Sequence, residues 1–245
     1  MAVYREDPDL QFLGRCENEM LDLLVSLITH DPQDNTLRWS ETLSGSDNYQ
    51  RFYPAHRNYW QEIAAEVQTF GSSSITSVFR GGKGVLYREV LGDVCDHVGV
   101  KYQKEETTEA IELALLMGLL EKSLSEMSPA ELREFADSME TELSAPTAPL
   151  ILMAIQTAVR ASGFAAYRLS VVMLSTLARV VLSRTLPMVA YLTLTRSISV
   201  LAGPVGITLS TAWLVADMTG PAYRVTVPAC LLVACLRQQV LHNTQ

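Results

Sequence analysis

Residues 108–124 read TEAIELALLMGLLEKSL, and this stretch sets the fold class. Its apolar side chains recur every three or four residues, at Ile111, Leu115, Leu116, Leu119 and Leu120, which predicts an amphipathic α-helix. The following segment, Ser128-Pro129-Ala130-Glu131, has the form of a capping box with proline at the first helical position. Few segments alternate with a period of two, so we expect an all-α protein.

The composition limits the class of protein further. The chain has 245 residues, of which 48% are hydrophobic and 19% charged, and it contains four cysteines. A chain this apolar is not expected to be disordered, and four cysteines do not make a disulfide framework. The net charge of −8 argues against nucleic acid as a partner, because such proteins present a basic patch.

Charge is distributed very unevenly along the chain. Residues 1–145 hold 12 Lys and Arg against 26 Asp and Glu, a net charge of −14. Residues 146–245 hold seven Arg and one acid, Asp217, a net charge of +6. We therefore predict an acidic soluble helical domain over 1–145 and an apolar, Arg-containing helical region over 146–245. The basic half is the part expected to contact a membrane or another polyanion.

The apolar half offers several candidate membrane contacts. If residues 150–182 form one helix, Arg160, Arg168 and Arg179 fall within an arc of about 100°, which suits a helix lying at a membrane surface or packed on the acidic half. Residues 197–216 form a 20-residue uncharged run that is long enough to span, to dip into the membrane as a hairpin or to pack in a core. The apolar segment 225–236 is too short to span. The predicted membrane contacts are Arg160, Arg168, Arg179, Arg184, Gly203, Pro204 and Gly206.

A polar cluster in the first half is a candidate surface for a protein partner. It surrounds a glycine-rich turn at 80–84 and the helix expected after it. The alternative is an ordinary surface salt-bridge network, which stabilises little. The predicted partner surface is Arg80, Lys83, Tyr87, Arg88, Glu89, Asp93 and Asp96.

No arrangement of residues predicts an active site. The turn at 80–84 lacks the spacing and the Ser or Thr of a P-loop, and Cys95 and His97 point apart on a helix. The acidic residues Glu105, Glu106, Glu109 and Glu112 are interpreted as a solvated helix face. We therefore expect a non-enzymatic protein with no cofactor and no metal.

Four segments resemble the bacterial YaaW family, which is commonly grouped with the ubiquinol–cytochrome c chaperones. They read DPDLQFLGRC (7–16), WQEIAAEVQTFGSSSITSVFRGGKGVLYREVLGDVCDHVGV (60–100), LAGPVGITLS (201–210) and GPAYRVTVPACLLVACLR (220–237). The resemblance covers nearly the whole chain in order and carries no catalytic residue over to it. The chaperone grouping implies, by distant similarity, assistance to a membrane protein during assembly.

Three hypotheses of function remain open at this stage. The first is a membrane-associated binding or assembly protein, cytoplasmic and peripheral or partly embedded at the inner membrane, with a membrane or membrane protein as partner and possible homo-oligomers. The second is a membrane-permeabilising toxin or defence effector. The third is a soluble α-helical interaction protein whose apolar half is its core and whose Arg residues pair with the acids of 1–145.

Overall fold

The computed structural model describes residues 2–31, 36–71, 84–139, 141, 143–182 and 223–243. Within these ranges the chain is helical, and no β-strand occurs among them, which confirms the all-α prediction.

The described residues of the first half form six α-helices and two 3-10 helices. Their order is η1 (Gln11–Arg15), α1 (Asn18–Thr29), α2 (Asp47–Phe52), η2 (His56–Tyr59), α3 (Trp60–Phe70), α5 (Tyr87–Val98), α6 (Thr108–Glu126) and α7 (Pro129–Ser138). The helix predicted over 108–124 is confirmed as α6. The predicted capping box at the start of α7 is also confirmed, because Ser128 and Glu131 bond reciprocally.

The second half contributes α8 (Ala148–Ala161), α9 (Gly163–Leu182) and α12 (Tyr223–Asn243). The single helix considered over 150–182 is wrong, because Ser162 is extended (φ −154°, ψ 133°) and separates α8 from α9. The common arc of Arg160, Arg168 and Arg179 depended on that single helix and no longer holds. The apolar segment 225–236 is part of a helix of 21 residues.

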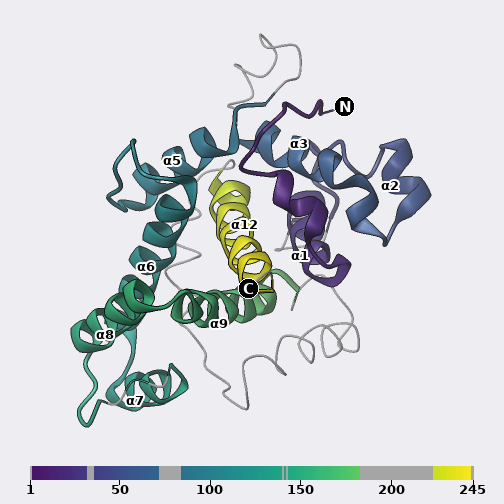
Figure 1. Ribbon diagram of the computed structural model, residues 1–245. Coiled ribbons are helices and arrows are strands. Elements are labelled where there is room, and N and C mark those ends of the chain that lie inside the picture. Colours follow the sequence, from purple (N-terminus) through teal and green to yellow (C-terminus); the bar gives the residue numbers. More distant parts are fainter. Residues whose placement is uncertain are drawn as a thin grey trace.

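α12 lies in the middle of the molecule. Figure 1 shows it in yellow, with α1 on one side and α5 and α6 on the other, and it contacts α9, α1, α6, α5 and α3. By length and composition α12 is the one described helix that could cross a membrane, yet 83% of its apolar window is buried in the protein. Core helices of soluble proteins share these properties.

One hydrophobic core extends across the predicted boundary at residue 145. It includes Leu24 of α1, Leu116 of α6 and Leu232 of α12. The prediction of a soluble domain separate from an apolar region therefore does not describe the packing of the described residues. The apolar side chains of α12 are covered by α9 and by helices from the acidic half, since each half alone would leave a large apolar face in water.

Candidate functional site

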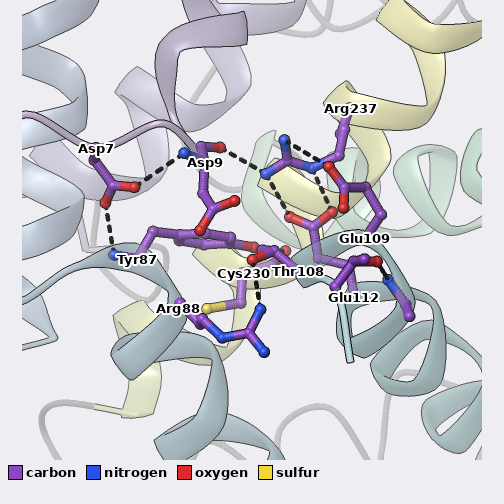
Figure 2. Close-up of polar contacts among 11 residues, drawn as sticks. Asp7, Asp9, Tyr87, Arg88, Thr108, Glu109, Glu112, Cys230 and Arg237 are labelled. Carbon is purple, nitrogen blue, oxygen red and sulfur yellow. Dashed lines mark hydrogen bonds and ion pairs between the residues drawn. The ribbon is translucent and has the colours of Figure 1, made fainter. Parts of the chain in front are cut away.

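The centre of the fold contains a buried charge network built around Arg237 of α12. Its Nε lies 2.6 Å from Oε2 of Glu112 on α6, and its Nη2 lies 3.1 Å from Oε1 of the same carboxylate. Nη2 also donates to the carbonyl oxygen of Asp9 at 2.6 Å, and the guanidinium carbon lies 4.3 Å from the ring centroid of Phe12. Figure 2 shows the guanidinium between Asp9 and Glu112, so Arg237 joins α12 to α6 and to the N-terminal segment.

Burial and pairing act in opposite directions on these two charges. Burial raises the pKa of the Glu112 carboxyl, and the adjacent Arg237 guanidinium opposes that rise. Burial alone would lower the pKa of Arg237, but the Glu112 carboxylate outweighs it and raises that pKa above its usual value. Glu109 lies 3.8 Å from Arg237 and is half exposed, so it adds little. The bidentate geometry favours a fully ionised pair.

A second set of contacts extends the network to the start of α5. The Asp7 carboxylate accepts hydrogen bonds from the backbone N–H of Tyr87 at 2.7 Å and from Nε2 of Gln68 at 3.0 Å. The Tyr87 hydroxyl donates to the Cys230 carbonyl of α12 at 3.4 Å. Burial, followed by the nearby Glu112 carboxylate, raises the pKa of Tyr87 well above its usual value. Asp7 thereby joins α3 to the first turn of α5, where a carboxylate is favoured.

This network has the properties of a structural centre. The side chains of Asp7, Tyr87, Glu112 and Arg237 are all buried, and each has a partner within the protein. The described residues contain no group of three or more His, Cys, Asp or Glu that could hold a metal ion. All four cysteines are free and buried, and burial raises the pKa of Cys16 and Cys95 to about 12, so neither is an activated nucleophile.

The predicted partner surface is only partly a surface. Tyr87 is fully buried, which corrects its assignment, because its ring fills the space between α5 and α12. Glu89, Asp93 and Asp96 are exposed on α5, and burial, with Asp96 and Glu89 nearby, raises the pKa of Asp93. Arg80 and Lys83 lie outside the described residues.

Arg88 belongs to the same predicted surface but has an internal role. It is half buried and donates to the Thr108 hydroxyl at 3.0 Å, to the Lys104 carbonyl at 2.7 Å and to the Glu106 carbonyl. Arg88 therefore links α5 to the loop that precedes α6 and to the first residue of α6. Its guanidinium is occupied within the protein and is not available as an independent contact for a partner.

The predicted membrane contacts are only partly described. Arg160 is exposed on the last turn of α8, and Arg168 on α9 is half buried. The side chain of Arg179 falls outside the described residues, as do Arg184, Gly203, Pro204 and Gly206.

The interpretation of Glu112 as solvated is wrong, and Arg237 was missed as its partner. The sequence does contain the signal for Glu112. At 100° per residue, Glu112 shares the face of Leu115, Leu116 and Leu119, so it must enter the core with them. A buried carboxylate requires a cation, and Arg237 is the only Lys or Arg within the apolar run of α12 from residue 225 onward.

Comparisons with known proteins find relatives over nearly the whole chain. A family model described as "Domain of unknown function (DUF3944)" matches residues 4–39. A UPF0174 protein of Helicobacter pylori (strain J99) is 39% identical, with 96% of this chain and 92% of the relative covered. UPF0174 protein YaaW of Escherichia coli K12 is 34% identical, with 97% and 96% covered. No solved structure matches the chain.

Proposed function

The chain belongs to the UPF0174 family, and we propose that it is a non-enzymatic binding protein that acts at the cytoplasmic face of a membrane. Its finer role, following the chaperone grouping, is assistance to a membrane protein during assembly. The observation that carries the proposal is the charge of α8 and α9. These helices hold Arg160, Arg168 and Arg179 and no Asp, Glu or Lys, and the Arg160 side chain is exposed.

The charge pattern is consistent with an anionic lipid surface as the partner. Each cation near such a surface contributes about 1 kcal/mol of attraction. The acidic first half, with a net charge of −14, is repelled by the same surface. This opposition orients the protein with α8 and α9 toward the lipid and the acidic helices toward the cytoplasm.

The burial of α12 favours a second candidate, a soluble helical interaction protein. Its apolar window is 83% buried, and Arg237 is paired with Glu112 within the core. Both candidates are binding proteins, and they differ in whether the partner is lipid or protein.

Vesicle sedimentation with the purified full-length protein distinguishes the candidates. We expect binding to phosphatidylcholine vesicles only when they also contain phosphatidylglycerol, with binding weakened by salt because exposed charges are screened. Absence of binding to either vesicle would reject the membrane proposal in favour of the soluble one. Release of an encapsulated dye would instead support the membrane-permeabilising alternative.

A further inference from the structure

α8 is an apolar helix that lies on the surface of the protein. Its sequence is APLILMAIQTAVRA, and only Ile151 and Ile155 are buried. These two side chains are one turn apart and face the body, where α8 contacts α6 and α9. The rest of the helix is in contact with solvent to some degree, although its single charged residue is Arg160.

The outward face of α8 is apolar in the first half of the helix and polar in the second half. Leu150, Met153, Thr157 and Arg160 fall within an arc of about 80° at 100° per residue. Leu150 is 40% exposed and Met153 is 57% exposed, and they occupy the first half of the helix. The polar Thr157 and the charged Arg160 follow in its second half.

We infer that this face, consisting of Leu150, Met153, Thr157 and Arg160, is an interfacial membrane contact that lies in the headgroup region of an anionic bilayer. Leu150 and Met153 enter the boundary of the acyl chains, and Arg160 reaches phosphate groups while its methylene stem stays in the apolar layer. Leu150 is the third residue of α8 and Arg160 lies in its last turn, so the contact extends over most of the helix. The inference rests on the proposed function and names the surface that performs it.

Charge complementarity selects lipid as the occupant. The only ionic group of the face is the cation Arg160, and α8 contains no Asp, Glu or Lys. An anionic bilayer provides an apolar layer beneath a negative layer, which is the order of groups that this face requires.

A fluorescent probe tests the contact directly. The four natural cysteines are buried, so an environment-sensitive dye can be attached selectively to the full-length variant Met153→Cys. The matched control is Asp93→Cys on the exposed face of α5. With phosphatidylglycerol-containing vesicles we expect a blue shift in the emission of the dye at 153 and no change at 93.

The outcomes separate this inference from the function on which it rests. If the labelled protein sediments with the vesicles but the dye at 153 does not shift, α8 is not the contact and the proposed function survives. If the protein does not sediment, both are wrong.

Affinity measurements on charge variants provide a second test. Met153→Glu is expected to weaken vesicle binding at least about tenfold, and Arg160→Ala about fivefold. The control Gln61→Glu adds the same charge as Met153→Glu at an exposed position of α3, and its effect is expected to be much smaller. Lipid-free dimers that Met153→Glu dissociates would instead identify a second copy as the occupant and would overturn the inference.

Discussion

Replacement of Arg237 by Met removes the charge at the centre of the fold and keeps an unbranched side chain of similar length. The variant leaves the Glu112 carboxylate fully buried without its two hydrogen bonds of 2.6 and 3.1 Å. The carbonyl oxygen of Asp9 also loses its donor, and Phe12 loses the cation above its ring. Glu112 and Phe12 are buried, so water cannot readily replace the contacts that they lose.

These lost contacts determine the expected loss of stability. Removal of one partner of a buried ion pair lowers the free energy of unfolding by about 3–5 kcal/mol, whereas the half-exposed Glu109 contributes little. For a protein of this size the loss corresponds to a decrease in Tm of roughly 6–20 °C. Since the free energy of unfolding of a typical domain is about 5–15 kcal/mol, Arg237→Met is expected to leave a marginally stable protein.

The pH dependence of the variant identifies the cause. Burial raises the pKa of Glu112 above the usual 4.5, and the variant removes Arg237, the largest of the influences that oppose that rise. The folded variant then holds a proton that the unfolded chain releases near pH 4.5, so stability falls as pH rises above that value. The deficit relative to wild type should therefore be smallest in acid and larger at neutral pH.

Urea denaturation followed by circular dichroism measures these free energies. The control Arg160→Met removes an exposed arginine and should change the free energy of unfolding by less than about 0.5 kcal/mol. The double variant Arg237→Met with Glu112→Leu should recover most of the loss, because an apolar pair needs no partner. If Arg237→Met lowers the free energy of unfolding by less than about 1 kcal/mol, or if the double variant recovers none of the loss, the buried pair does not have the stabilising role described above.

Two further predictions concern packing and ionisation. Gly84→Ala should lower the free energy of unfolding by about 1–3 kcal/mol, because its Cβ would overlap the Gln68 backbone. A Cβ at Gly163 meets nothing within 4 Å, so the control Gly163→Ala should be neutral or slightly stabilising. Equal effects of the two variants in urea denaturation would contradict this prediction. The pKa values of the Cys16 and Cys95 thiols are raised from 9.0 to about 12, so the unfolded chain ionises first and stability should fall as pH rises from 9 toward 12. If the stability of the wild type relative to a Cys16→Ala variant does not change over that pH range, the raised pKa of the Cys16 thiol is contradicted.

The sequence predicts local structure well wherever the signal is local. The period of 108–124 and the pair Ser128 and Glu131 specify α6 and the start of α7 without reference to any distant residue. The break at Ser162 was missed because apolar residues continue on both sides of it. Its signal is the Ser-Gly pair at 162–163, which disfavours an uninterrupted helix.

The central site could not be derived in the same way, because its partners are far apart in the chain. Arg237 and Glu112 are separated by 125 residues, and their pairing depends on how α12 packs against α6. Periodicity indicates that Glu112 is buried, and only the packing identifies its cation. The exposed face of α8 could not be predicted from the sequence either, because hydropathy alone does not distinguish a surface helix from a core helix.

Fractionation of the untagged protein from the cells that make it tests the proposed membrane function most directly. We expect the protein to pellet with membranes and to be released by high salt or alkaline carbonate, because α8 contacts the surface while α12 stays buried in the protein. Recovery in the soluble fraction throughout would contradict the membrane proposal. Resistance to both washes would contradict a contact limited to the surface.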